Sequence, residues 1–213
     1  DGEDPDPAAL KERALAVEAI ARAVPGVTNS EGGSASAGRT VVGFATSQGF
    51  AAACSASIYG TSVVVLAEQD GAMERDYAYR TVRHWADAES VESLGQRAGE
   101  RAVRKVGAKS IAGGKMPIVL DPRVSAGLIG HLMGAISGTA IARRTSFLLD
   151  DEGKMVFAPT ISIIDEPHRM RALGSRPFDG EGLPTAKRAL VEGGVLTGWL
   201  CDAASARQLG RTP

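Results

Sequence analysis

Histidine is the scarcest reactive side chain of this sequence, with only His84, His131 and His168. His84 falls on an expected strand edge and His168 in an expected loop, so both are predicted to be surface hydrogen-bonding groups. His131 stands in the middle of an uncharged segment of helical pattern, where an imidazole needs a reason to be present. The structural reason would be a core histidine that hydrogen-bonds a backbone carbonyl.

Glycines at a spacing of four surround this histidine. Because Gly130, Gly134 and Gly138 repeat at helical spacing, they would let another element approach that face of the helix. A glycine inside a helix costs roughly 1 kcal/mol relative to alanine, which close packing has to offset. We therefore expect Gly134 and Gly138 to face a neighbouring backbone.

The sequence does not contain the other common catalytic or cofactor-binding motifs. Lys109 and Met116 occupy the places where a phosphate-binding loop around Gly114-Lys115 needs a glycine and a serine or threonine. No GxGxxG follows an expected strand, and no serine lies in a GxSxG turn. The acidic run at 150–152 is followed by Gly153 and is predicted to be a solvated turn rather than an acid/base pair.

The elements that must position these residues fall into two parts. In the first, an amphipathic helix is expected between Asp6-Pro7 and Pro25-Gly26, and a second helix over 89–106 with Gly107 as its cap. An Asp70-Gly71 turn lies within an expected sheet between them. The expected strands are Thr40–Thr46, Phe50–Tyr59, Ser62–Glu68 and Met73–Trp85.

In the last of these strands, Tyr77, Tyr79 and Thr81 share one face and alternate with residues of the opposite face, which predicts a half-exposed strand.

A linker over Lys109–Lys115 separates the second part, so we expect a boundary near residues 113–114. This part is predicted to contain a strand over Met116–Leu120 and a long helix from Asp121-Pro122 to about Arg143. A looped, β-rich region follows, and a helix over Ala203–Leu209 is capped by Gly210. Its expected strands are Phe147–Asp150, Met155–Phe157, Thr160–Ile164 and a hairpin of Ala186–Val191 with Val195–Cys201. The fold class is therefore α+β, mainly antiparallel sheet with about four helices. Nothing in the sequence after the last helix could pack on it, which indicates a piece of a larger protein.

Composition excludes several classes of protein. The 213 residues are 44% hydrophobic and 23% charged, as in a folded globular chain, and they suffice for a core without disulfides or metals. A net charge of −1 disfavours direct nucleic-acid binding. Cys54 and Cys201 are too few and too far apart for a disulfide framework, which favours a reducing compartment. The uncharged stretches Thr40–Ala67 and Val124–Ala142 are interrupted by polar residues and glycines, so we expect no membrane helix.

Longer segments resemble one family. Residues 117–210 contain DPRVSAGLIGHLMGAISGTAIARRTSFL, SRPFDGEGLPTAKRALVEGGVLTGWL and ASARQLG, and residues 10–106 contain GFATSQGFAA and MERDYAY. These segments resemble the TldD/PmbA zinc metallopeptidases, also described as modulators of DNA gyrase, and are most similar to the PmbA (TldE) branch. The resemblance implies that residues 1–113 are a central α+β region and that 114–213 begin a C-terminal metallopeptidase-like domain. It also implies that the N-terminal domain and most of the C-terminal domain are absent.

The resemblance bears directly on His131. The matching helix of the TldD branch carries HExxxH, in which the histidines bind zinc and the glutamate is the general base. In this chain His131-Leu132-Met133-Gly134-Ala135-Ile136 stands there, so the glutamate is replaced by Leu132 and the second histidine by Ile136. Leucine cannot accept a proton and isoleucine cannot bind a metal, so we expect neither a catalytic residue nor a zinc site in this chain. Positions five apart also lie roughly 140° apart on an ideal helix, so two metal ligands at this spacing would need a local distortion such as a π-bulge.

Two functional hypotheses follow. In the first, the chain is part of a non-catalytic, cytoplasmic subunit that pairs with a zinc-containing TldD-type subunit, or with itself, and holds peptides or unfolded chains for cleavage. An extended peptide would add to a strand edge. In the second, it is a stand-alone binding protein that modulates DNA gyrase or another protein without proteolysis. Arg143-Arg144 and the run 168–171 are local basic spots that could contact an acidic partner. A peptidase with its ligands in the missing part is a third possibility, against which Leu132 argues.

Overall fold

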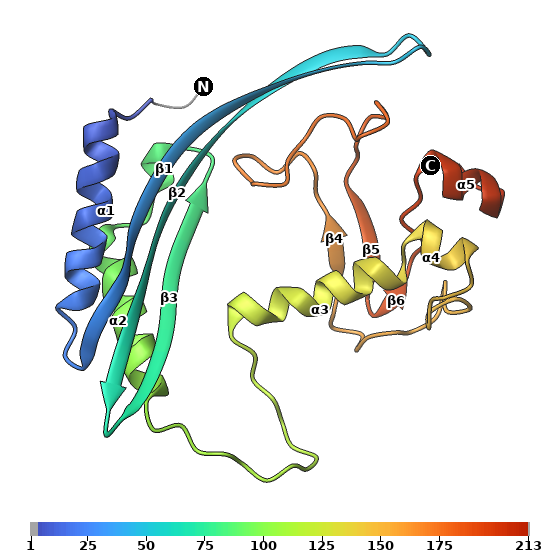
Figure 1. Ribbon diagram of the computed structural model, residues 1–213. Helices are drawn as coiled ribbons and strands as arrows, with labels where there is room; N and C mark the ends of the chain where they lie inside the picture. Colours follow the sequence, from blue (N-terminus) through green and yellow to red (C-terminus); the bar gives the residue numbers. More distant parts are fainter. Residues whose placement is uncertain (1–3, 213) are drawn as a thin grey trace. The chain divides into compact units, whose positions relative to one another are not determined.

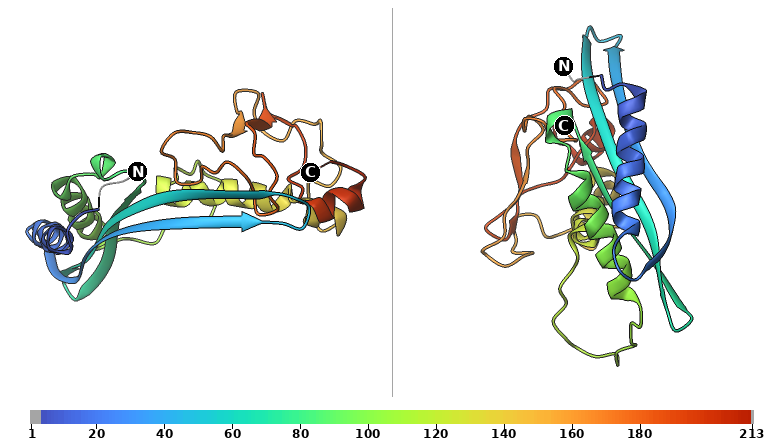
Figure 2. Two further views of the ribbon diagram at one scale, coloured as in Figure 1. Left: turned by 90° about the horizontal axis from the view of Figure 1, so that it is seen from above. Right: turned by 90° about the vertical axis from the view of Figure 1, so that its left-hand side faces the viewer.

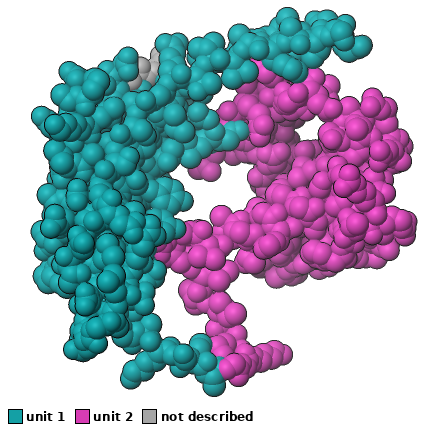
Figure 3. All heavy atoms as spheres, viewed as in Figure 1, with its two compact units in different colours: residues 1–112, 170–174 teal, residues 113–169, 175–213 magenta. Residues whose placement is uncertain are grey.

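The computed structural model describes residues 4–212, which form two compact units (Figure 3). Unit 1 comprises the chain up to residue 112 together with residues 170–174, and unit 2 comprises residues 113–169 and those from 175 onward.

Unit 1 is a three-stranded antiparallel sheet in the order β1-β2-β3, with two helices on one of its faces (Figures 1 and 2). Its elements are α1 (Pro7–Arg22), β1 (Val27–Ala45), β2 (Ala51–Gln69), β3 (Ala72–Val82), the 3-10 helix η1 (Trp85–Asp87) and α2 (Val91–Lys105).

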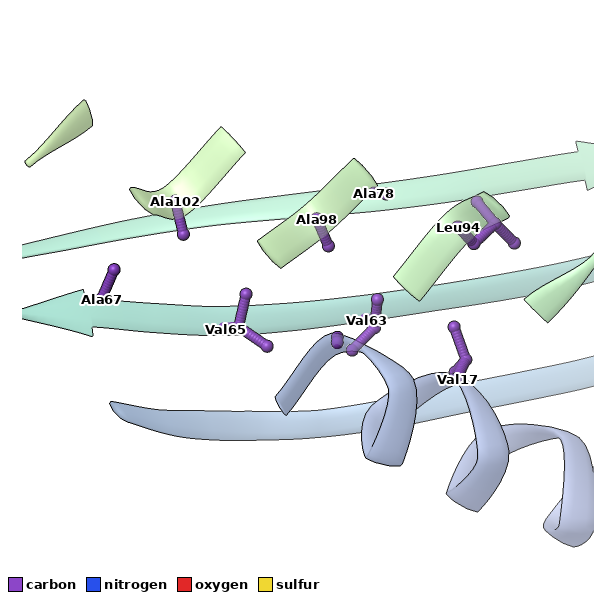
Figure 4. Packing of buried hydrophobic residues seen from close by; sticks show 9 residues of the cluster. Val17, Val63, Val65, Ala67, Ala78, Leu94, Ala98 and Ala102 are labelled. Atoms are coloured by element: carbon purple, nitrogen blue, oxygen red, sulfur yellow. The ribbon is translucent and has the colours of Figure 1, made fainter. Parts of the chain in front are cut away.

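Small apolar side chains form the core of unit 1 between the helices and the sheet (Figure 4). Alternate residues of β2 face the helices, and residues of α2 at a spacing of four face the sheet. Glycines of α2 bring the two helices together: a Cβ at Gly99 would lie 2.5 Å from a methyl carbon of Val24, and one at Gly95 would lie 2.7 Å from a methyl carbon of Ile20. The buried cluster consists of Val17, Ala21, Val63, Val65, Ala67, Ala78, Leu94, Ala98 and Ala102.

Local signals of the sequence are confirmed at the helix ends and at one turn. The Asp6 carboxylate accepts a hydrogen bond from the Ala8 N–H at 2.8 Å, and Pro7 opens α1. Between β2 and β3, Asp70 and Gly71 have φ of 54° and 80°. These left-handed conformations make the two-residue turn that an Asp-Gly pair favours.

The predicted bounds of the strands are wrong. β3 ends at Val82 rather than Trp85, so His84 lies after the strand and not on its edge. β1 begins at Val27 rather than Thr40, and β2 continues through Gly60-Thr61, where a break was expected. Gly60 pairs with Ser36 on one side and Thr81 on the other, and a Cβ there would lie 2.9 Å from the Ser36 Oγ. The glycine thus meets a close neighbour inside a strand and does not mark a turn.

Unit 2 consists of short helices and a small sheet (Figure 1), and it has a second hydrophobic core. Its elements are α3 (Pro122–Ala135), α4 (Gly138–Ala142), β4 (Ile163–Asp165), β5 (Arg188–Glu192), β6 (Val195–Leu196) and α5 (Ala203–Leu209). The strands form an antiparallel sheet in the order β4-β5-β6. The buried cluster consists of Leu132, Ala135, Ile136, Leu148, Leu190, Val191 and Leu196.

Several expectations for this unit are wrong. Residues 116–120 form no strand, and Val119 is 97% exposed, so no neighbouring strand covers it. Residues 147–150 form turns, and only Met155 of 155–157 makes a bridge, to Val195. The α+β class is confirmed, with five α-helices among the described residues, since the long helix divides into α3 and α4.

Candidate functional site

Helix α3 carries the positions that the family resemblance aligns with the zinc-binding helix. Asp121 fixes its start, because its carboxylate accepts the Arg123 N–H at 2.9 Å and Pro122 occupies the first turn. The same carboxylate lies 3.1 Å from the Arg123 Nε. The sequence around Asp121 therefore determines where the helix begins.

The three aligned side chains do not meet on one surface. His131 is exposed, whereas Leu132 is 5% exposed and Ile136 is fully buried. Leu132 and Ile136 belong to the core of unit 2 together with residues of β5 and β6. The expectation of a core histidine is wrong, because the side chain of Leu132 is buried in the core and that of His131 is not.

Tertiary hydrogen bonds end α3 at the last of these positions. The Leu200 N–H donates to the Ile136 carbonyl at 2.8 Å, and the Gly138 N–H donates to the Leu200 carbonyl at 2.7 Å. Ser137 and Leu200 accordingly form a parallel bridge. The expected helix to Arg143 is wrong because these backbone groups bond to Leu200 in place of the helical partners.

The residues present do not fit a zinc ion. One exposed imidazole stands beside two aliphatic side chains, whereas zinc requires several convergent nitrogen, oxygen or sulfur ligands. Within residues 4–212, no group of three or more His, Cys, Asp or Glu side chains could hold a metal ion.

The prediction that Gly134 and Gly138 face a neighbouring backbone is wrong for Gly134, and at Gly138 the close neighbours are side chains rather than backbone. A Cβ at Gly138 would lie 2.5 Å from the Ser205 Oγ and 2.9 Å from the Cys201 Sγ, so this glycine does face close neighbours. A Cβ at Gly134 would have no described atom within 4 Å, and the same holds for Gly127 and Gly130. The spacing of four therefore does not mark a packed face of α3 among the described residues.

The other polar candidates take part in surface interactions. The His168 Nε2 lies 3.0 Å from the Thr185 Oγ1, in agreement with a surface hydrogen-bonding role. Arg211 binds Glu152 through two nitrogens, and these hydrogen bonds lower the pKa of the glutamate. A general acid needs a raised pKa, so Glu152 is not suited to acid catalysis.

A carboxylate with a strongly lowered pKa, that of Glu89, lies in unit 1. Arg97 donates to both oxygens of Glu89 at 2.6 and 2.8 Å and lowers the pKa of that glutamate from 4.5 to about 2. Ser93 also donates to Glu89, at 2.6 Å. Groups with shifted pKa values are frequent in active sites, but Glu89 owes its lowered pKa to an ion pair with Arg97 at the start of α2.

One surface of unit 1 is not visible in the sequence, because that surface depends on the register of the sheet. The alternation in β3 places Tyr77 and Tyr79 on one face, but only strand pairing shows that Ser62 lies beside Tyr79 and Ser34 beside Ser62.

No described helix is long and apolar enough to cross a membrane.

Comparisons with known proteins agree with the resemblance. Residues 1–106 match the PmbA/TldA metallopeptidase central domain, and residues 113–213 match the PmbA/TldA metallopeptidase C-terminal domain. The chain is 36% identical to the metalloprotease PmbA of Escherichia coli O157:H7, over 95% of this chain and 45% of that protein. It is 33% identical to a PmbA homologue of Haemophilus influenzae, over 92% of this chain and 43% of the relative. It thus spans less than half the length of these relatives.

Solved structures share the fold. A protein of Bacteroides thetaiotaomicron, described as a candidate modulator of DNA gyrase, matches with a TM-score of 0.91 and 28% identity, over 100% of this chain and 52% of the other. TldE of Thermococcus kodakarensis matches with a TM-score of 0.78 and 21% identity, over 98% of this chain and 47% of the other. With both domain matches, these likenesses establish that the chain belongs to the PmbA/TldD metallopeptidase family.

Proposed function

We propose that this chain is part of a non-catalytic PmbA/TldE-type subunit that pairs with a zinc-containing TldD-type subunit and holds peptides or unfolded chains for cleavage. One observation carries the proposal: Leu132 and Ile136 stand where the zinc helix has its general base and second imidazole, and both are buried in the core of unit 2. A buried aliphatic side chain can neither bind a metal nor move a proton.

Two further assignments accompany this role. Residues 1–113 would form the central region, and 114–213 would begin the C-terminal metallopeptidase-like domain. We place the subunit in the cytoplasm, where Cys54 and Cys201, which are free thiols in the structure, would stay reduced.

The test uses the full-length protein with its TldD-type partner. Alone, the full-length protein should not cleave an unstructured peptide, while the mixture should, and a chelator should abolish the activity by removing metal from the partner. The decisive variant replaces the HExxxH glutamate of the partner by glutamine. If that mixture still cleaves at the parent rate, the catalytic group lies in the present subunit and the proposal is wrong.

The second candidate function is a binding protein that modulates DNA gyrase without proteolysis. It is favoured by the description of the Bacteroides thetaiotaomicron protein, which shares the fold over the whole of this chain. Purification of the tagged full-length protein from its native cells separates the two candidates. A stoichiometric zinc-containing partner supports the subunit role, whereas recovery with gyrase, or alone, supports the second candidate.

A further inference from the structure

The face of the unit 1 sheet opposite its helices has a hollow of about 520 Å³. All three strands line it, and its side chains are mostly hydroxyl-bearing: Ser34, Ser36, Thr61, Ser62, Tyr77, Tyr79 and Thr81. None of the nine residues that line it is charged.

Strand register explains the shape of this hollow. Ser34, Ser62 and Tyr79 form one row across the three strands, and Ser36, Gly60 and Thr81 form the next. Gly60 leaves the middle of the second row without a side chain. The small residues of β1 and β2 therefore line the hollow beside the rings of Tyr77 and Tyr79 on β3.

The two tyrosines are arranged as a contact surface. Their ring centroids lie 6.0 Å apart with an angle of 24° between the ring planes, and Tyr77 and Tyr79 are 37% and 54% exposed. Tyrosine provides rigid, amphipathic contact area at low cost in conformational entropy, and serine and glycine provide adaptable hydrogen bonding. The binding loops of antibodies, which recognise proteins and peptides, are rich in these residue types.

One ion pair lies close to the hollow, and Arg83, two residues after Thr81 and just past the end of β3, donates to the Ser57 carbonyl at 3.3 Å. Arg75, two residues before Tyr77 on the same face of β3, binds both carboxylate oxygens of Glu31 at 2.8 and 2.9 Å. The Arg75 and Glu31 charges compensate each other, and no charged side chain lines the hollow itself, so an uncharged ligand fits it.

The edge of β3 beside the tyrosines is less suited to peptide addition than this face. The Tyr77 N–H donates to the Asp76 carboxylate at 2.7 Å, and the Arg75 carbonyl accepts from the Lys105 Nζ at 3.2 Å. A strand added to that edge would have to displace these bonds before forming its own.

We infer that the hollow binds an extended, uncharged stretch of polypeptide, which packs on Tyr77 and Tyr79 and hydrogen-bonds the serine and threonine hydroxyls through its backbone. This inference rests on the proposed substrate-holding role and specifies its location and ligand. The absence of charge in the hollow would let one surface accept many unfolded sequences.

The test measures binding of a fluorescein-labelled, neutral, unstructured 12-residue peptide to the full-length protein by fluorescence anisotropy. Tyr77→Ala and Tyr79→Ala should each raise the Kd about tenfold. Tyr79→Phe should keep most of the affinity, because it retains the ring. Leu15→Ala changes an exposed residue of α1 and should leave the Kd unchanged. Unchanged melting temperatures establish that the variants are folded.

Three outcomes would overturn the inference. If the parent binds the peptide but both alanine variants bind it equally well, the hollow is not the site, while the substrate-holding role survives. If maltohexaose binds at the tyrosines and the peptide does not, the ligand class is wrong. If the parent binds no peptide at all, both the inference and the substrate-holding role fail.

Discussion

Restoring the metal motif tests whether the core of unit 2 really encloses the two altered positions. The double variant Leu132→Glu/Ile136→His recreates HExxxH beginning at His131. In the structure, however, the new carboxylate would replace a side chain that is 5% exposed, and the new imidazole one that is fully buried. Both would enter a cluster of leucine, isoleucine and valine side chains. We expect the variant to be strongly destabilised rather than to gain a zinc site.

The magnitude follows from the burial. An unpaired carboxylate in an apolar core lowers the free energy of unfolding by about 4 kcal/mol or more. For a chain of this size, 1 kcal/mol changes the Tm by about 2–4 °C, so the Tm should fall by roughly 8–16 °C from the glutamate alone. Loss of the packed Ile136 side chain adds to this fall.

Circular dichroism melting at pH 7 provides the measurement, with a chelator present so that zinc cannot compensate. His131→Ala is the matched control: its side chain is exposed, so the free energy of unfolding should change by less than about 0.5 kcal/mol. A double variant that melts within 2 °C of the parent, and that binds one zinc per chain once the chelator is removed, would refute the placement of Leu132 and Ile136 in the core.

Two further predictions concern stability. Gly138→Leu should lower the free energy of unfolding by about 1–3 kcal/mol, because a Cβ there would lie 2.5 Å from the Ser205 Oγ. Gly134→Leu should be tolerated, and urea denaturation that ranks the two variants in the opposite order would contradict the packing. Arg97 lowers the pKa of Glu89 from 4.5 to about 2, so the stabilisation is complete above pH 4.5 and is lost as the pH falls toward 2. Glu89→Gln should therefore be less stable than the parent at pH 7 by roughly 1–3 kcal/mol, and most of this difference should be lost by pH 2; a difference as large at pH 2 as at pH 7 would exclude the ion pair as its source.

The start of α1 and the β2–β3 turn were predictable because short-range interactions set them. Asp6 before Pro7 caps a helix within two residues, and Asp70-Gly71 adopts the left-handed turn without help from distant parts of the chain. That Leu132 and Ile136 provide neither a base nor a metal ligand was likewise readable, since it depends on residue type alone.

Long-range pairing decided the rest. Gly60 signals a turn by itself, but its two strand partners keep β2 continuous, and residues 116–120 have a strand composition but no described neighbour to pair with. The end of α3 at Ile136 depends on Leu200, which lies 64 residues away in the sequence. Burial of Leu132 and exposure of His131 were also undetermined by residue type, because a nearly uncharged helix does not indicate which of its faces packs. The sequence alone therefore determined that Leu132 and Ile136 provide neither a base nor a metal ligand, and only the tertiary structure determined that both lie in the core of unit 2.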